Sequence, residues 1–459
     1  MFAISPDMRV MVVGFGKSGL SAIRFCQGLG AEVILSEAGP VDQATASWLQ
    51  RRGVVYEAGG HSSKFCGSAD LILISPGVPH YLPVLREADQ QGIPVIGELA
   101  LARDYLKTPV VAITGTNGKT TVTTLLGELL QAGGRKVFVG GNIGAPLTDY
   151  LAGPQEADWV VLEVSSFQLD AAEDFRPDIG ILLNISPDHL DRYATFADYA
   201  STKMRLLAGQ RAGDMAIINH DDREILQLRQ LSSGLKGEVL YFGHNLPDGC
   251  RGAQINGSKV LVSGRAGEDD WQCDLTGTSM GQSPNLENAA AAILAAQAAG
   301  CPRPAIAGSL AQFKSLPHRM TLVAKIDGVK YIDDSKATNI GAVGAALDSI
   351  SEPVVLIAGG RDKGGDYGLL AGPIREKVKA LLLIGEARYK MAAALKTLTR
   401  VELLDSLEQA IDLAGTISAP GDVVLLSPAC SSFDMFSGYA QRGEAFQRLV
   451  RQRPGGEGG

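Results

Sequence analysis

Short runs of β-branched and apolar residues alternate along the chain with stretches of helical periodicity, and glycine-containing turns join them. The first such unit has an apolar run at Met8–Val13, a turn at Gly14–Gly19 and a helical stretch at Leu20–Leu29. Further apolar runs follow at Ala31–Leu35 and Leu71–Ile74. Strand–helix–strand units of this kind place their strands side by side and parallel in one sheet. The chain is therefore expected to have an α/β fold built on parallel sheets.

The length of the chain and the spacing of these units predict three domains. A chain of 459 residues exceeds what one hydrophobic core normally organises. We predict an N-terminal Rossmann-like domain at residues 1–105, a central domain with a parallel sheet at 106–315, and a C-terminal Rossmann-like domain at 316–459. Within the central domain, the turn-rich segment Glu238–Cys273 is expected to be an antiparallel insertion, and alanine-rich Glu287–Ala299 a packed helix.

Charge and composition argue against several classes of protein. The formal net charge is −8, and such an acidic surface disfavours binding to nucleic acid or to anionic membranes. We find no signal-peptide pattern and no apolar stretch of the ~18 residues that a membrane-spanning helix needs. The six cysteines are scattered and form no CxxC pair, so we expect reduced and mostly buried thiols. The expected compartment is the cytoplasm, and the expected state is a monomer.

The most specific motif is the turn Gly115–Thr121, GTNGKTT, which follows the apolar strand Val110–Ile113. A glycine turn that leads into a helix N-terminus directs backbone N–H groups at phosphate oxygens. Lys119 would neutralise the β- and γ-phosphates, and the Thr120 hydroxyl would ligate Mg²⁺. Ile113 stands where the full GxxxxGK[ST] pattern has its first glycine, so this is a shortened P-loop. The central domain is therefore predicted to be a P-loop ATPase, and the alternative is a purely structural turn.

A second glycine motif, GFGKSG at Gly14–Gly19, follows the first predicted strand, and Glu37 ends the next one. This is the pattern of a dinucleotide-binding turn with an acidic residue placed for a ribose hydroxyl. The residues leave three interpretations open: a redox dinucleotide, another nucleotide such as a UDP-sugar, or a structural turn. Nothing else in the sequence suggests hydride transfer.

Two further polar segments begin where buried strands are expected to end. Glu163 opens EVSSFQL, where its carboxylate is placed either to hold Mg²⁺ against nucleotide phosphates or to cap the next helix. His189 lies between Asp188 and Asp191 in NISPDHLDRY, as a site residue or as a capping or surface histidine. Lys203 is expected on the following helix, and its spacing alone predicts a solvated lysine.

The C-terminal block carries several polar segments near expected strand ends. LPHRM at 316–320 places two basic groups at the domain junction. IDDSKATN at 332–339, GGRDKGGD at 359–366 and SPACSSFD at 427–434 each follow a strand, and the second of these combines cations with glycines, which suits an anion. Each loop alone is compatible with a solvated turn. Three such loops at successive strand ends of one sheet predict a shared binding edge.

Taken together, these motifs resemble those of the Mur ligases of bacterial cell-wall synthesis, along nearly the whole chain. GTNGKTT, EVSSFQL, NISPDHLDRY, LPHRM, IDDSKATN and SPACSSFD occur in the family's order and are similar to the type that joins D-glutamate to UDP-N-acetylmuramoyl-L-alanine. The resemblance implies a UDP-binding N-terminal domain, a central ATPase and a C-terminal domain for the amino acid. It also implies ATP and two Mg²⁺ ions, and an acyl-phosphate intermediate.

The resemblance further implies roles for single residues. The phosphate-binding loop would consist of Gly115, Thr116, Asn117, Gly118, Lys119, Thr120 and Thr121. The two Mg²⁺ ions would be held by Thr120 and Glu163, and by His189 and a carbamylated Lys203. Other nucleotide contacts would come from Asn285, Asn288, Arg319, Asp334 and Lys336. The catalytic residues would be Lys119, Glu163, His189, Lys203, Arg319 and Lys336.

Substrate contacts follow from the same resemblance. The uridine would meet Ser18 and Glu37, the muramoyl group Asn142 and His189, and D-glutamate Thr338, Lys363, Ser432 and Tyr439. The chain departs from the family pattern at Ser283–Asn285, at Glu37–Ala38 and at Tyr439, which bear on the adenine, uridine and amino-acid contacts.

Three alternatives to this function remain. The first is a sister ligase, or a folylpolyglutamate-type ligase, that adds another amino acid. The sequence lacks the Asp-Asn-Pro-Arg motif of the diamino-acid enzymes. The second is a P-loop motor or switch that hydrolyses ATP without an amino acid, and the third is a Rossmann oxidoreductase that binds a nicotinamide.

Overall fold

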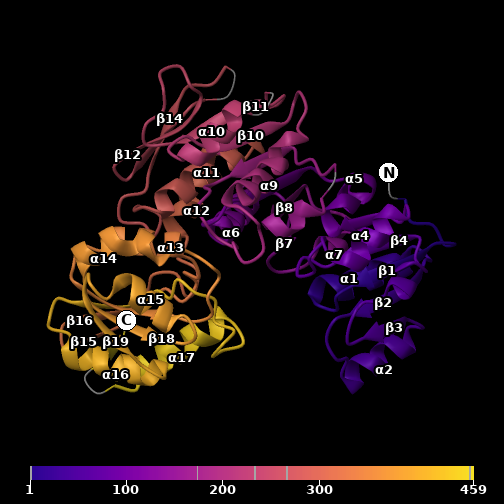
Figure 1. Cartoon of the computed structure of the whole chain (residues 1–459). Helices are drawn as coiled ribbons and strands as arrows, with labels where there is room; N and C mark the ends of the chain where they lie inside the picture. The colour runs from indigo at the N-terminus through magenta and orange to yellow at the C-terminus, as the bar shows by residue number, and fades with distance from the viewer. Residues whose placement is uncertain (1–2, 173, 232–233, 265–266, 454–455, 459) are drawn as a thin grey trace.

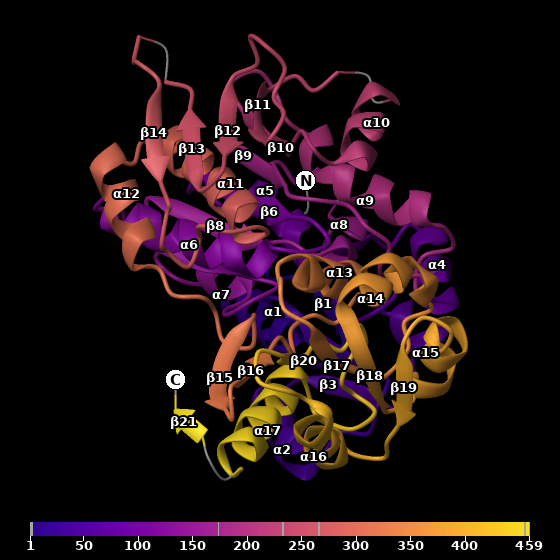
Figure 2. The same ribbon diagram turned by 90° about the vertical axis from the view of Figure 1, so that its left-hand side faces the viewer.

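The computed structural model describes residues 3–172, 174–231, 234–264, 267–453 and 456–458. It has three α/β domains, each built around its own sheet, as predicted. The N-terminal domain (indigo) and the C-terminal domain (orange to yellow) lie on opposite sides of Figure 1, both below the central domain. The turned view in Figure 2 also places both of them at the same end of the central domain. Ligands held by the outer domains can therefore approach the central sheet from one end.

The N-terminal domain has a parallel sheet with the strand order β3-β2-β1-β4-β5. Its strands are β1 (Arg9–Val13), β2 (Glu32–Glu37), β3 (Val55–Ala58), β4 (Leu71–Ile74) and β5 (Val95–Gly97). Its helices are α1 (Lys17–Gly28), α2 (Gln43–Arg51), α3 (Ser63–Cys66) and α4 (Pro83–Gln90). The 3₁₀ turn η1 (Glu98–Leu101) and α5 (Ala102–Tyr105) then lead to the central domain.

The glycine turn between β1 and α1 is too tight for side chains at its ends. Gly14 has φ +90°, in the left-handed region that glycine tolerates best. A Cβ at Gly19 would lie 1.9 Å from the carbonyl oxygen of Gly14, whereas a Cβ at Gly16 would meet no atom within 4 Å. The turn therefore depends on Gly14 and Gly19, and the helix after it begins at Lys17 rather than at the predicted Leu20.

The central domain has the strand order β14-β13-β12-β11-β10-β9-β6-β8-β7. Its strands are β6 (Val110–Thr114), β7 (Val137–Gly141), β8 (Trp159–Glu163), β9 (Ile179–Leu182), β10 (Met215–Asn219), β11 (Glu238–Gly243), β12 (Gly252–Asn256), β13 (Lys259–Val262) and β14 (Trp271–Asp274). Its helices are α6 (Lys119–Ala132), α7 (Leu147–Leu151), α8 (Ser166–Asp170), α9 (Phe196–Ala208), α10 (Arg223–Leu231), α11 (Asn285–Ala298) and α12 (Arg303–Gln312). Strand β6 pairs in parallel with both β8 and β9, so the three carboxyl ends meet at one edge.

The predicted antiparallel insertion is only partly correct. Strand β11 pairs in parallel with β10, and β12 pairs in parallel with β11; only β13 and β14 are antiparallel. The reason is tertiary, because α11 packs across β11 and β12 and makes them an extension of the central sheet. The predicted alanine-rich helix is confirmed as α11, whose residues Ala289–Ala296 are at most 1% exposed.

The C-terminal domain has the strand order β19-β18-β17-β20-β16-β15-β21. Its strands are β15 (Thr321–Ile326), β16 (Val329–Asp333), β17 (Val354–Gly359), β18 (Val378–Ile384), β19 (Arg400–Leu403), β20 (Val423–Leu426) and β21 (Gly456–Gly458). Its helices are α13 (Ile340–Asp348), α14 (Ala371–Lys377), α15 (Arg388–Leu395), α16 (Leu407–Ile417) and α17 (Tyr439–Arg451), with a 3₁₀ turn η2 (Tyr367–Leu370). Strands β16 to β20 are parallel, and the hairpin strand β15 is antiparallel.

All six cysteines are unpaired and five are buried, as expected from their scattered positions. In the described part of the chain, no helix is long and apolar enough to cross a membrane.

A buried polar cluster joins the N-terminal and central domains. Glu98, 7% exposed, accepts hydrogen bonds at Oε1 from the backbone N–H of Thr148 (2.7 Å) and from its hydroxyl (3.1 Å). Ser21 on α1 donates to Asp149 (2.6 Å), and its Oγ lies 2.7 Å from that of Thr148. The Oε2 atom of Glu98 has no hydrogen-bond partner among the described residues. Burial of this half-satisfied carboxyl raises its pKa to about 7.

Substitution of Gly19 by alanine should destabilise the N-terminal domain, because the new Cβ would overlap a backbone oxygen that cannot move independently. Overpacking of this kind typically costs about 1–3 kcal/mol. Urea unfolding should show this loss for Gly19→Ala, and a much smaller change for the matched control Gly16→Ala, which places its methyl group in open space. Equal losses in both variants would contradict the steric account.

Glu98 should make stability depend on pH. Its folded pKa of about 7 lies above the usual glutamate value of 4.5, so its contribution to the free energy of unfolding is fully present below pH 4.5 and is lost as the pH rises through 7. Glu98→Gln should remove this pH dependence. Between pH 5 and pH 8, the free energy of unfolding of the wild type should fall by about 3 kcal/mol relative to that of Glu98→Gln. Urea midpoints across that range measure the effect. Exposed Glu128 on α6 supplies the control Glu128→Gln, and a wild-type slope in Glu98→Gln would contradict the assignment.

Candidate functional site

The turn between β6 and α6 has the geometry of a phosphate-binding loop. Gly115 has φ +153° and Gly118 has φ +85°. A Cβ at Gly118 would lie 2.2 Å from Oδ1 of Asn288, so this position accepts only glycine without rearrangement. Lys119 begins α6, and its Nζ donates to the carbonyl oxygens of Gly115 and Thr116, both at 2.8 Å. The lysine thus folds back over the loop that precedes its helix.

A neighbouring asparagine fixes the shape of this loop. Asn184 follows β9 and accepts at Oδ1 from the N–H of Asn117 (2.8 Å), while its Nδ2 donates to the Asn117 carbonyl (3.1 Å). Its own carbonyl accepts from the N–H of Thr116 (2.9 Å). Sequence reasoning did not single out Asn184, although it opens the motif NISPDHLDRY. Its position directly after a buried strand was the available signal.

Glu163 ends β8 beside the loop and is 3% exposed. Its Oε1 accepts from Nδ2 of Asn142 (3.0 Å), and its Oε2 has no hydrogen-bond partner among the described residues. The alternative role as a helix cap is wrong, because Ser165 caps α8 through a reciprocal bond with Gln168. A buried carboxylate oxygen without a partner is costly and fits a site for a cation.

His189 lies in the turn after β9 and is half-buried. Its φ is +55°, which is uncommon for a residue with a side chain. Its ring packs edge-on against Phe167, with 4.7 Å between the ring centroids. Burial lowers the pKa of His189 to about 4, so the imidazole is neutral near pH 7 and keeps a lone pair for a ligand.

Lys203 corrects the prediction made from its spacing alone. It lies on α9 and is 1% exposed rather than solvated, because α9 packs this face against the phosphate loop. Its Nζ donates to the carbonyl of Gly115 (2.8 Å) and lies 4.6 Å from the ring centroid of Tyr199. Burial, with the nearby charge of Lys119, lowers the pKa of Lys203 well below its usual value. A buried amine of this kind is largely neutral and nucleophilic.

The predicted C-terminal residues approach the phosphate loop across the domain boundary. Burial lowers the pKa of Lys119, and the charges of Arg319 and Lys336 lower it further. Burial raises the pKa of Asp334 to about 7, and this side chain accepts a hydrogen bond from Ser427 (2.8 Å). Three cations therefore converge where phosphates would carry negative charge.

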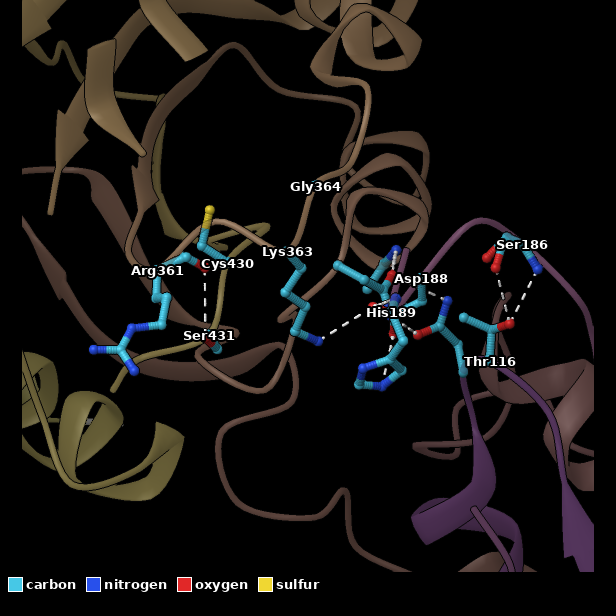
Figure 3. Close-up of polar contacts among 12 residues, drawn as sticks. Thr116, Ser186, Asp188, His189, Arg361, Lys363, Gly364, Cys430 and Ser431 are labelled. Atoms are coloured by element: carbon cyan, nitrogen blue, oxygen red, sulfur yellow. Dashed lines mark hydrogen bonds and ion pairs between the residues drawn. The ribbon is translucent and has the colours of Figure 1, made fainter. Parts of the chain in front are cut away.

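Side-chain polar contacts join the central and C-terminal domains beside the phosphate loop (Figure 3). Lys363 points from the loop after β17 to Asp188, with 3.2 Å between Nζ and Oδ1. Asn339, which caps α13, donates to Asp188 (3.2 Å) and to Oδ1 of Asn117 (2.9 Å). Burial opposes the charge of Asp188, but the cation of Lys363 holds its pKa below the usual range. The C-terminal domain is thus hydrogen-bonded to the phosphate loop itself.

A cavity of about 670 Å³ lies between the N-terminal and central domains. Its lining includes three residues predicted for the UDP-linked substrate, Ser18, Glu37 and Asn142. The Glu37 carboxylate accepts from the backbone N–H groups of Phe15 (2.6 Å) and Gly39 (3.0 Å), which ties the glycine turn after β1 to the end of β2. Asn142 links this cavity to Glu163 at the phosphate loop.

The remaining predicted residues divide into two groups. Asn285 and Asn288 lie together at the start of α11, with 3.5 Å between their side chains, and Asn288 touches the phosphate loop. Thr338, Ser432 and Tyr439 make their contacts inside the C-terminal domain. The Thr338 N–H donates to the Lys336 carbonyl, the Ser432 carbonyl accepts from the Phe436 N–H, and Lys336 lies 3.8 Å from the ring centroid of Tyr439.

Comparisons with known proteins agree with this arrangement. Residues 8–97 match the model of the MurD-like N-terminal domain of Mur ligases, residues 113–296 the Mur ligase middle domain, and residues 318–430 the Mur ligase glutamate ligase domain. The chain belongs to the Mur ligase family. The resemblance predicted from the six sequence motifs is therefore confirmed, and the fold class with it.

Similar proteins cover nearly the full chain. A protein named UDP-N-acetylmuramoylalanine–D-glutamate ligase from Desulfosudis oleivorans is 44% identical over 99% of this chain and 98% of its own. One of the same name from Pelotomaculum thermopropionicum is 42% identical over 96% and 97%. Among solved structures, a pseudomurein peptide ligase type C from Methanothermus fervidus shares the fold, with a TM-score of 0.60 and 19% identity over 97% of this chain and 100% of that one.

Lys203 should carry a carbon dioxide adduct, because a buried neutral amine reacts with CO₂ to form a carbamate. Native mass spectrometry in bicarbonate buffer near neutral pH should show a mass increase of one CO₂ that disappears on acidification. Lys203→Gln should lack the increase, and Lys136→Gln, at a lysine side chain that is 73% exposed, should keep it. An increase that persists in Lys203→Gln would place the adduct elsewhere.

Proposed function

We propose that this protein joins D-glutamate to UDP-N-acetylmuramoyl-L-alanine at the expense of ATP, through an acyl phosphate, in the synthesis of peptidoglycan precursors. Relatives that carry the name of this enzyme are 41–44% identical over nearly the whole chain. The structural observation that carries the proposal is the junction of the phosphate loop with the cationic loop of the C-terminal domain, through Asp188, Asn339 and Lys363.

Charge repulsion is the first obstacle to the reaction, because a carboxylate must approach the γ-phosphate of ATP. Lys119 at the phosphate loop, with Arg319 and Lys336 from the C-terminal domain, would offset that repulsion. The substrate carboxylate then attacks the γ-phosphorus, ADP leaves, and the acyl phosphate remains. The cavity lined by Asn142 opens beside Glu163, which would place the reacting end of the UDP-linked substrate near the phosphates.

The chain offers donors that fit Mg²⁺, although no group of three or more His, Cys, Asp or Glu side chains clusters as a metal site among the described residues. Glu163 has a buried oxygen without a partner, His189 is neutral, and a carbamate on Lys203 would add a carboxylate-like ligand. We infer that Thr120 and Glu163 would hold one ion and that His189 and modified Lys203 would hold another. Bound Mg²⁺ would neutralise phosphate charge and orient the γ-phosphate.

The second step forms the amide bond. The deprotonated amine of D-glutamate attacks the acyl carbon, and the tetrahedral intermediate expels phosphate. Water would compete for the same carbon. The closed contact between the central and C-terminal domains would exclude water from the acyl phosphate. Lys363, in a glycine-rich loop at that contact, is suited to a carboxylate of the amino acid, and Thr338, Ser432 and Tyr439 are proposed to complete its binding site.

ATP and UDP-linked sugars are cytoplasmic metabolites, so we place the reaction in the cytoplasm. The substrate residues discussed above all come from one chain, and a monomer is sufficient to build the site. The motor, switch and oxidoreductase alternatives do not fit membership of a ligase family. A sister ligase shares the fold, so the identity of the amino acid needs a direct test.

Phosphate release from ATP, with UDP-N-acetylmuramoyl-L-alanine and one amino acid at a time, tests the proposal. D-Glutamate alone should support rapid release, with one amide formed per phosphate; L-glutamate, L-alanine and a diamino acid should not. Lys119→Met should lower kcat by about 10²–10³ or more, because an aligned charge at the transferring phosphate is lost. The control Lys136→Met changes an exposed lysine of the same domain and should retain activity.

The outcomes separate the alternatives. Release with another amino acid keeps the chemistry but assigns the protein to a sister activity. Release that needs no amino acid and yields no amide contradicts the ligase function.

A further inference from the structure

The ion pair between Lys363 and Asp188 spans the cleft that an amino acid must enter. The side chain of Lys363 is 18% exposed and that of Asp188 is 7% exposed, and the two come from different domains. Figure 3 shows the lysine extended toward the carboxylate, with its Nζ in contact with Oδ1. A cavity of only about 10 Å³ lies beside them, bounded by Pro187, Leu190 and Tyr367. An amino acid can therefore reach these charges only if the Lys363 loop moves away from Asp188.

The two charges complement those of the incoming substrate. D-Glutamate carries two carboxylates and one ammonium group. Lys363 on the C-terminal side is suited to a carboxylate, whereas the nitrogen must point to the central domain, where the acyl phosphate forms. Asp188 lies on that side, and its charge acts on Lys119 at the phosphate loop. The cation of the pair thus lies where a carboxylate of the amino acid should bind, and the anion lies where its nitrogen should bind.

Three other carboxyl groups near the cleft are placed differently from Asp188. Glu163 accepts from Asn142 and faces the proposed cation site. Asp334 accepts from Ser427 and lies near Arg319. Asp191, in the same turn as Asp188, is exposed. Asp188 is thus the buried carboxylate whose cationic partner lies in the C-terminal loop proposed to bind the amino acid.

We propose that Asp188 binds the ammonium group of the incoming amino acid, which enters between Asp188 and Lys363 and exchanges their ion pair for two new pairs. The ammonium group then lies on Asp188 and one carboxylate lies on Lys363. No covalent bond forms or breaks in this step. The inference rests on the proposed function and adds to it the residue that selects an α-amino dicarboxylate over a plain dicarboxylate.

The exchange leaves each of the two protein charges with a counter-charge. Before entry, one anion and one cation neutralise each other at 3.2 Å. After entry, each protein charge has a substrate partner, so neither buried group loses its counter-charge. A dicarboxylate without nitrogen would occupy Lys363 but would leave Asp188 facing no cation. Such a ligand should therefore bind more weakly than D-glutamate, for an electrostatic reason that can be measured.

The test compares D-glutamate with glutarate, which has the same carbon chain and both carboxylates but no nitrogen. Both are titrated calorimetrically into the full-length enzyme holding ADP and UDP-N-acetylmuramoyl-L-alanine, so that no turnover is required. Asp188→Asn removes the charge and keeps one oxygen, which can still accept from the His189 N–H, while its amide nitrogen takes the place of the oxygen that accepts from Asn339. In this variant the preference for D-glutamate over glutarate should fall by about ten-fold or more. Glutarate itself should bind as well or better, because Lys363 loses a competing partner.

Two variants separate this role from a general loss of structure. Lys363→Met should weaken the binding of D-glutamate and of glutarate alike. The ratio of the two affinities should stay close to that of the wild type. Asp191→Asn changes an exposed carboxylate in the same turn and should alter the affinity for neither ligand. The three variants together show whether the charge at position 188 acts on the nitrogen of the ligand.

The outcomes also separate this inference from the proposed function. If the wild type makes no amide with D-glutamate, the proposed function is wrong and the inference falls with it. If the amide forms but Asp188→Asn keeps the wild-type ratio, only the ammonium-binding role of Asp188 is contradicted. A loss of affinity for both ligands in Asp188→Asn, with the ratio unchanged, would likewise assign Asp188 to the domain contact alone.

Discussion

The parallel pairing of β6 with β8 and β9 is the constraint on which the site depends. It brings the carboxyl ends of three buried strands to one edge, so that the phosphate loop, Glu163 and Asn184 meet there. Backbone hydrogen bonds in a sheet fix such positions more tightly than loops can. The glycines of the loop then allow Asn288 and Leu183 to approach its backbone closely. A shift of one strand by one residue would turn these side chains to the other face.

The site is built from charges that are expensive to bury. Lys203 and Glu163 are both at most 3% exposed, and Glu163 has an oxygen without a hydrogen-bond partner among the described residues. Such groups would destabilise the chain unless a ligand or a modification compensates them. Their presence beside a phosphate loop is therefore a stronger indication of function than the loop alone. The same reasoning explains why His189, neutral through burial, differs from an ordinary surface histidine.

Contacts between domains position the outer domains around the phosphate loop of the central sheet. Glu98 and Thr148 tie the N-terminal domain to α7 of the central domain, and Asn339 ties the C-terminal domain to the phosphate loop. The cavity proposed for the UDP-linked substrate and the cationic loop proposed for the amino acid thereby face the phosphate loop from two directions. A reaction that joins two substrates by way of a phosphate requires this meeting of three sites. Because polar interfaces between the domains of one chain commonly allow relative motion, the contacts are suited to opening and closing during turnover.

The sequence by itself determined the α/β fold, the three domains, the family and the loop that would hold phosphates, because strand periodicity and motif chemistry are local properties of the chain. The spacing of Lys203 did not by itself reveal its burial, and the turn-rich pattern did not reveal that β11 and β12 are parallel. The sequence also left Asn184, Asn339 and the Lys363–Asp188 pair unassigned. Those features depend on which helix covers which strand and on how two domains meet, so contacts between residues distant in the sequence decide them. Only the tertiary structure brings such residues together.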